Sequence, residues 1–328
     1  MKVKDLGEFK LIEVIEHVIG KHGTGAIQLG IGDDAAAWRS NGSIELCTID
    51  TLVQDIHFNL GNTGYADLGW KALAVNLSDI AAMGGMPLHA LVSLSLPGYT
   101  EVDDIKKLYE GMLKLARKYD VAIAGGDVVR APQLTISISV IGRATGDTVL
   151  KRSAAAAGDH IAVTGTLGAS AAGLQILTGK LAPPDGEAIS TLRMAHLTPE
   201  PRLAEGQLLA KNGVKAAIDI SDGLLGDLGH ICTSSAVGAE IYAGNVPVNP
   251  LVSTVFKEDA VRLALSGGED YELLFCAAPQ VIGVIKNTTD TQITVIGSIT
   301  DGHPGEVILL DADGNKIKPD EKGWNHFS

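Results

Sequence analysis

The sequence has few cysteines, no long hydrophobic run and fewer basic than acidic residues. Its three cysteines, Cys47, Cys232 and Cys276, stand far apart without a C-x-x-C pair, which excludes a disulfide framework and is typical of reduced thiols. Gly, Pro and His interrupt every apolar stretch before about 18 residues, so we expect no membrane span and a cytoplasmic protein. The net charge of −13 disfavours binding to nucleic acid or anionic lipid, because that affinity comes largely from Lys and Arg.

The length and composition predict two mixed α/β domains. With 328 residues, 45% of them hydrophobic, the chain can bury a sizeable core. The segment GRATGDTVLKRSAAAAGDH is rich in small and turn-forming residues, so we expect domains at residues 1–150 and 151–328. Hydrophobic periodicity predicts helices at residues 8–19, 66–83, 102–119, 169–177, 201–212 and 223–234. It predicts strands at residues 44–48, 121–124, 133–142, 160–164, 216–218, 271–276 and 292–296.

Acidic residues are concentrated in the N-terminal part of the chain. The stretch IQLGIGDDAAAW places Asp33 and Asp34 side by side between an apolar run and a group of alanines. Two carboxylates about 4 Å apart repel by roughly 4 kcal/mol at an effective dielectric of about 20, and an apolar setting adds a desolvation cost. Residues 26–83 hold seven acidic residues and two basic ones, so local ion pairs cannot neutralise them. This pattern predicts a bound cation.

Asp79 is the strongest single indication of a metal site. Its neighbours on both sides of the predicted helix WKALAVNLSDIAAMG are apolar, so we expect this helix to be buried. A buried aspartate with no adjacent Lys or Arg needs a metal, a cationic ligand or a proton. Oxygen ligands without clustered His or Cys favour Mg²⁺ over zinc, and proteins typically hold Mg²⁺ with carboxylates together with substrate phosphates.

Four more aspartates follow predicted strands. Asp50 ends IELCTID, Asp127 follows VAIAGG, and Asp219 and Asp222 lie in AAIDISDG. We expect these side chains where buried strands end, which is the usual place for ligand sites in α/β folds. Taken singly, each acid could instead cap a turn or a helix, or pair with a neighbouring base. That explanation would require the same coincidence in five separate segments.

Glycine-rich stretches offer weaker alternatives. Gly30, Gly32 and Ala35 fit the G-x-G-x-x-G/A dinucleotide pattern, but two aspartates stand where a pyrophosphate would lie, so we reject it. The stretch TGTLGASAAG follows a predicted strand, opens a helix and could approach a phosphate. A Walker A motif and the protein-kinase H-R-D and D-F-G motifs are absent.

Several motifs together resemble one family. In chain order they are GIGDDAA, TIDTLVQDIHF, KALAVNLSDIAAMGGMP, AGGDVVR, IDISDGLLGDLGHI, LSGGEDYELLF and KGWNHF. They resemble the motifs of the thiamine-monophosphate kinases, which belong to the aminoimidazole ribonucleotide synthetase-like superfamily. The resemblance spans residues 9–327, and the combination of TDTLV, SGGEDYEL and KGWNHF is specific to these kinases within the superfamily.

The resemblance implies a fold and a reaction. The fold would be a two-domain aminoimidazole ribonucleotide synthetase-like α/β (α+β) fold, with an N-terminal sheet-plus-helix domain that pairs in a homodimer and a C-terminal α/β domain. The activity would be that of a thiamine-phosphate kinase, which transfers the γ-phosphoryl group of ATP directly to thiamine monophosphate in thiamine diphosphate biosynthesis. The acceptor phosphate is already anionic, so no general base and no catalytic side chain is expected. Several Mg²⁺ ions would offset the repulsion between the two polyanions.

The resemblance also implies roles for individual residues. The metal ligands would be Asp34, Thr48, Asp50, Asp79, Asp127, Asp219 and Asp222. The ATP contacts would be Tyr109, Gly126, Asp127, Arg152 and Ser221, and the substrate pocket would contain His57, Glu269 and Trp324. Arg152 would add positive charge near the phosphates, and the Trp324 ring could stack on a heteroaromatic cation. As alternatives, His57 could be a core histidine and Trp324 a plug at the C-terminus.

Some positions depart from the family pattern. Ile49 stands where the family commonly has Thr, Val128 and Val129 stand where hydroxyl residues are frequent, and residues 154–157 are alanines where a glycine and a KPGD turn are usual. These departures bear on nucleotide affinity. Two other functions fit the aspartates. A sister ATP-dependent synthetase of the superfamily should lack the pair of His57 and Trp324, and a non-catalytic Mg-nucleotide sensor would not form thiamine diphosphate.

Overall fold

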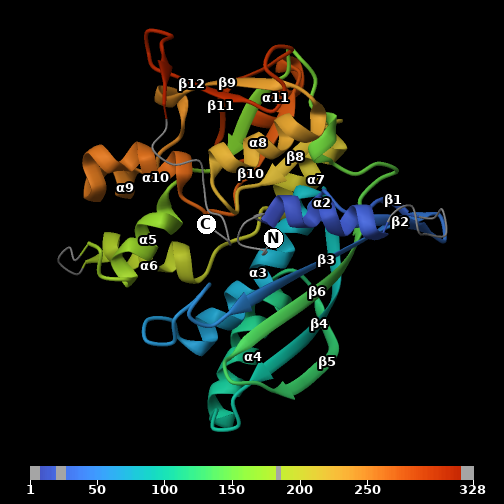
Figure 1. The fold of residues 1–328 in the computed structure, drawn as a ribbon, viewed down its shortest axis with the longest axis vertical. Helices are drawn as coiled ribbons and strands as arrows, with labels where there is room; N and C mark the ends of the chain where they lie inside the picture. The colour runs from blue at the N-terminus through green and yellow to red at the C-terminus, as the bar shows by residue number, and fades with distance from the viewer. Residues whose placement is uncertain (1–7, 20–26, 182–185, 319–328) are drawn as a thin grey trace.

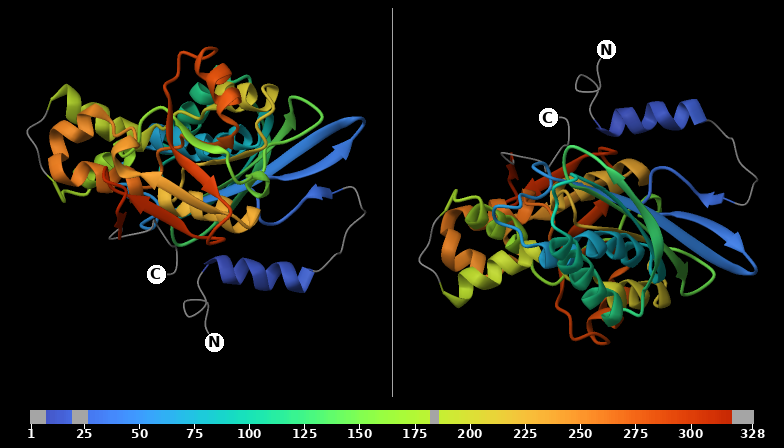
Figure 2. Two further views of the ribbon diagram at one scale, coloured as in Figure 1. Left: turned by 90° about the horizontal axis from the view of Figure 1, so that it is seen from above. Right: turned by 90° about the horizontal axis from the view of Figure 1, so that it is seen from below.

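The structure is a computed structural model that describes residues 8–19, 27–181 and 186–318. Two β-sheets divide these residues, and the chain passes from the first sheet to the second through residues 145–159 (Figure 1). One helix, α2 (Glu8–Ile19), precedes the sheets and stands off from the rest of the molecule in both views of Figure 2. Within the described ranges, no helix combines the length and the apolar character needed to cross a bilayer.

The first sheet has six strands and carries two long helices. Its spatial order is β1 (Ile27–Leu29), β2 (Ala36–Ser40), β3 (Ser43–Val53), β6 (Thr135–Ala144), β4 (Gly85–Leu96) and β5 (Ala122–Arg130). Neighbouring strands are antiparallel except β4 and β5, which are parallel. Helix α3 (Tyr65–Ala82) packs on β3, β4 and β6, and α4 (Val102–Lys118) packs beside it.

The second sheet has seven strands in the order β13 (Lys316–Ile317), β12 (Val307–Leu310), β9 (Gly238–Tyr242), β11 (Ile293–Thr300), β7 (His160–Thr164), β10 (Leu273–Ala277) and β8 (Ala216–Asp219). Only β9 and β12 are parallel. Its helices are α5 (Ala169–Leu177), α6 (Glu187–Leu197), α7 (Leu203–Lys211), α8 (Leu224–Ser235), α9 (Pro250–Phe256), α10 (Ala260–Ser266) and α11 (Pro279–Lys286). Three short 3₁₀ segments are η1 (Arg152–Ala154), η2 (Ala243–Asn245) and η3 (Lys257–Asp259).

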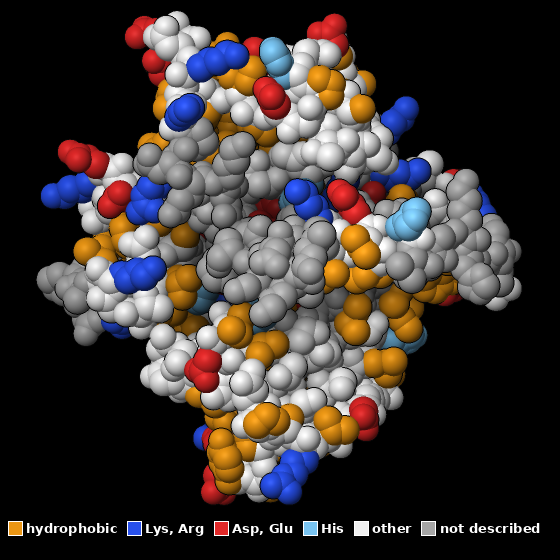
Figure 3. All heavy atoms as spheres, viewed as in Figure 1, with side chains coloured by type: hydrophobic (Ala, Val, Ile, Leu, Met, Phe, Trp, Pro, Cys, Tyr) orange, Lys and Arg blue, Asp and Glu red, His pale blue; other side chains and the backbone are white. Residues whose placement is uncertain are grey.

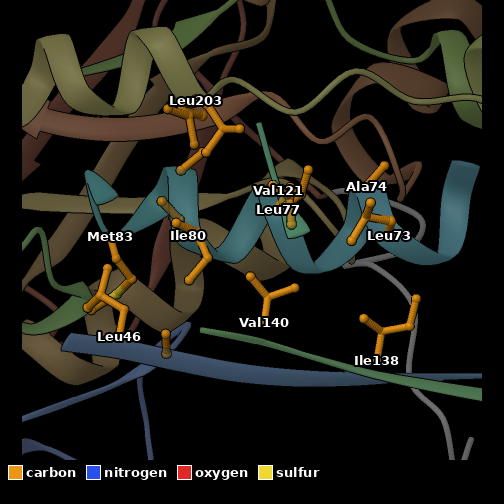
Figure 4. Packing of buried hydrophobic residues seen from close by; sticks show 14 of the residues in the cluster. Leu46, Leu73, Ala74, Leu77, Ile80, Met83, Val121, Ile138, Val140 and Leu203 are labelled. Carbon is orange, nitrogen blue, oxygen red and sulfur yellow. The ribbon is translucent and has the colours of Figure 1, made fainter. Parts of the chain in front are cut away.

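Helix α3 lies between the two sheets and is buried along most of its length, as its composition predicts. Figure 4 shows Leu73 and Ile80 of this helix on the side of Ile138 and Val140 of β6. Glycines let α4 approach closely, since a Cβ at Gly69 would lie 1.8 Å from the Leu108 carbonyl oxygen. Because the chain of apolar contacts continues into α7, β7, β8 and β10, one core joins both sheets. Residues on both sides of the domain boundary expected near residue 150 therefore share this core, and the boundary stays a prediction.

The six predicted helices all form within a few residues of their expected ends. The strand predictions were too short at two functional positions. Asp50 lies inside the 11-residue strand β3, and Asp127 lies inside the nine-residue strand β5, so the expectation that both mark strand ends was wrong. Asp219 does end β8. The rejected dinucleotide pattern leads into strand β2 rather than a helix, which agrees with its rejection.

Candidate active site

Three carboxylates from distant parts of the chain meet where α3 approaches the second sheet. Asp34 lies in the turn before β2, Asp79 in the last turn of α3, and Asp219 at the end of β8. One oxygen of each carboxylate lies within 4.8 Å of one oxygen of each of the others. Asp34 is 7% exposed and Asp219 is 2% exposed. The prediction that dispersed acids converge is thus correct for these three residues.

Burial and mutual repulsion disfavour the charged forms of these acids. Burial raises the pKa of Asp79 well above its ordinary value, and the charges of Asp50 and Asp219 raise it further. Burial and the charge of Asp34 raise the pKa of Asp219 to about 7. A carboxyl group with such a pKa gains from a nearby cation, because the cation restores the charged form that the protein interior disfavours. The electrostatics therefore favour a cation at this cluster.

Hydroxyl groups and one guanidinium group orient the cluster. Thr48 donates a hydrogen bond to Asp79 Oδ2 over 2.5 Å, and Ser78 donates to Asp219 Oδ2 over 2.6 Å. Arg152 forms an ion pair with Asp34 Oδ1. The other oxygen, Asp34 Oδ2, is buried without a hydrogen-bond partner among the described residues. Buried polar atoms normally have a partner, so this oxygen, together with the carboxylate oxygens of Asp79 and Asp219, fits a Mg²⁺ ligand set.

Asp50 and Asp33 flank this cluster. Asp50 lies on the α3 side of β3, and its backbone N–H donates to Asn76 Oδ1 over 3.0 Å. Asp33 accepts the backbone N–H of Arg152 over 3.2 Å. Burial and the adjacent Asp34 raise the pKa of Asp33 to about 7. Asp33 therefore fixes the main chain at Arg152, which places the guanidinium group beside Asp34.

The loop after β8 carries Ser221 and Asp222 next to the cluster. Asp227 is 1% exposed, and its Oδ2 accepts the backbone N–H groups of Ser221, Asp222 and Gly223 at 3.0–3.2 Å. Asp222, Asp227 and His230 also lie close enough together to share an ion. The alternative that Asp222 caps α8 was wrong, because Gly223 precedes the helix and Asp227 reaches back from its first turn.

The predicted substrate residues His57 and Glu269 lie in a second polar group, near the N-terminal half of α3. Glu269 Oε1 lies 2.9 Å from Lys71 Nζ, and Glu269 Oε2 lies 3.2 Å from His196 Nδ1. Burial raises the pKa of Glu269, but the Lys71 ammonium group and, more weakly, His57 lower it below its ordinary value. His57 is half-buried, and its Nδ1 accepts the Val53 backbone N–H over 3.0 Å. The alternative of a core histidine is therefore not supported.

Lys71 and His196 were not predicted from the sequence. Lys71 lies eight residues before Asp79, so both side chains lie on the same side of α3. A lysine at this spacing inside an apolar helix is the signal that could have found it. His196 lies at the end of α6 and had no local pattern to mark it. Both residues reach Glu269 only through tertiary packing.

The two loops that carry the predicted nucleotide and substrate residues bond to each other directly. The Glu269 backbone N–H donates to the Ser221 carbonyl oxygen over 2.7 Å, and the Tyr271 N–H donates to the Ile220 carbonyl oxygen over 2.9 Å. Gly268 lies against the same loop, and a Cβ there would lie 2.5 Å from the Ser221 carbonyl oxygen. The loops at residues 220–223 and 267–272 therefore form one packed unit.

Three predicted residues, Gly126, Asp127 and Tyr109, lie on elements that carry no member of the carboxylate cluster or of the Glu269 group. Gly126 and Asp127 lie on the edge strand β5, which β4 and β6 separate from β3, so they lie about 14 Å from the Asp50 position. Gly126 has φ +156°, and a Cβ there would lie 1.8 Å from the Val92 carbonyl oxygen. Tyr109 lies on α4 and packs against the core that joins the two sheets. Trp324 lies outside the described residues.

The glycine-rich stretch TGTLGASAAG is not available to a phosphate. The N–H groups of Gly168 and Ser170 at the start of α5 donate to Asp270 over 2.6 Å and 3.1 Å. The Asp270 carboxylate already accepts hydrogen bonds from the N-terminal N–H groups of this helix, and its negative charge would repel a phosphate there. Phosphate binding at this loop was therefore a wrong alternative.

Comparison with known proteins identifies the family. A model described as AIR synthase related protein, N-terminal domain, matches residues 32–144, and the corresponding C-terminal domain matches residues 156–309. A thiamine-monophosphate kinase of Bacillus subtilis (strain 168) is 37% identical over 331 residues, covering 98% of this chain and 100% of that protein. One of Escherichia coli (strain K12) is 40% identical over 310 residues, covering 92% of this chain and 93% of that protein.

Solved structures agree with these matches. The structure described as AaThiL complexed with AMPPCP and TMP has a TM-score of 0.86 and 32% identity, and the match covers 99% of both chains. A thiamine-monophosphate kinase from Stenotrophomonas maltophilia K279a has a TM-score of 0.76 and 38% identity, covering 95% of this chain and 98% of that one. The matched regions include both sheets, the carboxylate cluster and the Glu269 loop. This chain belongs to the thiamine-monophosphate kinase family, with the two-domain fold of the AIR synthase related proteins.

Proposed function

We propose that this chain phosphorylates thiamine monophosphate to thiamine diphosphate with ATP as the phosphoryl donor. The observation that carries the proposal is the convergence of Asp34, Asp79 and Asp219 beside the loop that holds Glu269. The similar structure described as AaThiL complexed with AMPPCP and TMP supports the two substrates, since AMPPCP is an analogue of ATP.

The reaction needs orientation and charge neutralisation more than acid–base chemistry. An oxygen of the thiamine monophosphate phosphate attacks the γ-phosphorus of ATP, the bond between that phosphorus and the β–γ bridging oxygen breaks, and ADP leaves. The attacking oxygen is already anionic near neutral pH, so no side chain has to remove a proton. The remaining barrier comes from bringing two polyanions together, which explains the need for cations in the site.

We further propose that Mg²⁺ binds at the carboxylate cluster. Asp34, Asp79 and Asp219 would be its main ligands, and Thr48, Asp50 and Asp222 lie around them as further oxygen donors. When bound, magnesium supplies charge neutralisation for the phosphate oxygens of both substrates. Burial of the three main carboxylates holds their oxygens in place before the ion arrives.

Arg152 and Ser221 are suited to contact the nucleotide from the edge of this cluster. Arg152 lies in η1 and has a fixed main-chain position through Asp33. Its guanidinium group can bind phosphate oxygens in a bidentate manner. Ser221 lies in the loop that Asp227 holds. Both residues therefore sit next to the metal ligands rather than among them. The role of Tyr109 stays a prediction.

A homodimer would account for the position of Asp127. The face of the first sheet opposite α3 leaves apolar side chains exposed, including Ile49, which is 65% exposed, Leu91 and Val129. Figure 3 shows hydrophobic side chains over the lower half of one face, the part that holds the first sheet and α4 in Figure 1. An exposed apolar face on a sheet with a free edge strand favours a second copy as its cover. We propose that β5 contributes Gly126 and Asp127 to the site of the partner.

The proposed activity has a direct test. Purified protein with ATP, Mg²⁺ and thiamine monophosphate should give ADP and thiamine diphosphate in equal amounts, measured by chromatography. A nucleotide sensor would bind ATP and form neither product. A sister synthetase would form ADP only with a different acceptor. Absence of thiamine diphosphate under conditions where the protein binds ATP would refute the proposed function.

A further inference from the structure

Lys71 is a buried base in the middle of an apolar helix. It is 1% exposed, and an ammonium group at such a position costs several kcal/mol unless the interior supplies partners. Its Nζ lies 2.9 Å from Glu269 Oε1 and 3.2 Å from His196 Nε2. The ammonium group of Lys71 therefore contacts one carboxylate and one imidazole, and both belong to the second half of the chain.

The contact with Lys71 fixes the proton position on His196. An ammonium group can only donate, so Nε2 must accept, and a neutral ring then carries its proton on Nδ1. Burial and the Lys71 charge lower the pKa of His196 to about 4, which keeps the ring neutral at pH 7. The Nδ1 proton faces Glu269 Oε2 at 3.2 Å and Ser170 Oγ at 3.0 Å. Each oxygen of Glu269 thus faces its own donor.

The main chain of Glu269 is also constrained. Its φ is +66°, a left-handed conformation that costs a residue with a side chain about 1 kcal/mol or more. The hydrogen bond from its N–H to the Ser221 carbonyl oxygen holds that conformation. Although the side chain has two buried partners, it remains 27% exposed. The carboxylate is therefore held by two donors and still partly exposed, and His57 lies near enough for its charge to lower the pKa of Glu269.

We propose that Lys71 and His196 are positioning residues that fix the orientation of the Glu269 carboxylate for the cationic ring system of the substrate. This inference rests on the proposed function, because it assigns Glu269 to the thiamine monophosphate pocket. A carboxylate fixed in advance loses little freedom on binding, so its attraction to a cationic heterocycle is gained at a lower entropic cost. Neither residue contacts the proposed metal ligands, so their removal should affect one substrate and not the other.

The variant Lys71→Met tests this role with a readout that a merely structural role would not move. We expect the KM for thiamine monophosphate to rise about tenfold or more, kcat to change less than about threefold, and the Kd for AMPPCP to stay the same. Lys71→Arg keeps the charge and should restore the KM to within about threefold of wild type. Lys118→Met is the control, since Lys118 is an exposed lysine that pairs with Glu200 on the surface.

A double-mutant cycle with Glu269→Gln makes the test independent of folding. Lys71→Met alone leaves a partly buried carboxylate without its ammonium partner, whereas the double variant removes both charges and should fold. If Lys71 acts through Glu269, the double variant should have the same KM as Glu269→Gln. Additive effects, or a Lys71→Met variant with a lower melting temperature and an unchanged KM, would overturn the inference. A wild-type protein that binds AMPPCP but makes no thiamine diphosphate would instead refute the proposed function.

Discussion

At the scale of single residues, the site places acids closer together than solvent-exposed carboxylates would lie. Asp79 is the centre of this arrangement. It accepts a hydrogen bond from Thr48, and the negative charges of Asp50 and Asp219 raise its pKa. Asp79→Asn keeps the size of the side chain and its hydrogen-bond acceptor but removes the charge. We expect kcat to fall at least about 100-fold because the metal loses a charged ligand. Steady-state kinetics at saturating Mg²⁺ measure the loss.

The stability of the same variant separates a metal role from a structural one. Removing one of several repelling carboxylates should leave the melting temperature of the metal-free protein unchanged or raise it. Asp67→Asn is the matched control, because Asp67 lies on the same helix, is partly buried and lies near Lys114 instead of the cluster. A wild-type rate for Asp79→Asn would contradict its assignment as a metal ligand.

The sequence could identify the acids but not the residues that organise them. Asp79 stood out because an acid in an apolar helix has no local explanation. Asp34 stood out because it lies next to Asp33, and two adjacent carboxylates repel each other. Lys71 and His196 went unnoticed because their partner, Glu269, is distant in sequence from both. Asp127 was expected in the cluster, but the strand order places it across the sheet. Pair contacts between distant segments depend on packing that periodicity does not encode.

At the scale of elements, the contact between the loops at residues 220–223 and 267–272 should couple the two halves of the site. Gly268→Ala would push a methyl group against the Ser221 carbonyl oxygen, 2.5 Å away. We expect a loss of about 1–3 kcal/mol in the free energy of unfolding and a higher KM for both substrates, because both loops must shift. Urea titration and steady-state kinetics provide the two measurements.

A matched glycine substitution shows whether the loop contact is the cause. Gly283 lies in α11 with no atom near its Cβ position. Gly283→Ala should raise stability by about 0.5–1 kcal/mol and leave both KM values unchanged, because alanine favours a helix. If Gly268→Ala raised only one of the two KM values, the two loops would not act as one unit.

Elements were easier to predict than their lengths. The ends of α3 and α4 fell within a residue of the prediction, because α4 has strong hydrophobic periodicity and α3 is a long apolar segment that ends before two glycines. The strands β3 and β5 continue past polar and glycine-rich stretches, because neighbouring strands supply backbone hydrogen bonds whatever the side chains are. Strand β4 was not predicted, since its alternation in GMPLHALVSLSL is interrupted by Pro87 and His89.

At the scale of the whole molecule, stability should depend on pH and magnesium together. Burial, together with neighbouring acids, raises the pKa of Asp33 and Asp219 to about 7. Between about pH 4 and pH 7 the native state therefore binds more protons than the unfolded state, so the free energy of unfolding falls as pH rises. We expect the melting temperature in a chelator to drop by several degrees over this range, as measured by calorimetry.

Magnesium should reverse this trend, because it competes with protons for the same oxygens. The increase in melting temperature on adding Mg²⁺ should be larger at about pH 8 than at about pH 5.5. An equal increase in melting temperature at both pH values would mean that the ion binds away from the carboxyl groups whose pKa is raised. The variant Asp219→Asn should lose most of the magnesium effect at the higher pH.

Activity of mixed dimers tests the proposed role of Asp127. Asp79→Asn and Asp127→Asn should each be inactive as a pure homodimer. If each site combines Asp79 of one protomer with Asp127 of the other, heterodimers contain one intact site, and random mixing restores about a quarter of the wild-type activity. Coexpression with two different affinity tags isolates the heterodimer. No recovery in a dimer of confirmed mass would place both residues in the same protomer's site.

The proposed metal ligands Asp34, Asp79 and Asp219 are spread over more than half of the chain, and one hydrophobic core joins the segments that carry them. A nascent polypeptide that has emerged only as far as β6 holds two of the three and cannot assemble the ion-binding geometry. We therefore expect binding of a divalent ion at this cluster to follow, and not precede, folding of the second sheet. A fluorescent chelator competing for magnesium during refolding would report completion of the native state and ignore partly folded intermediates.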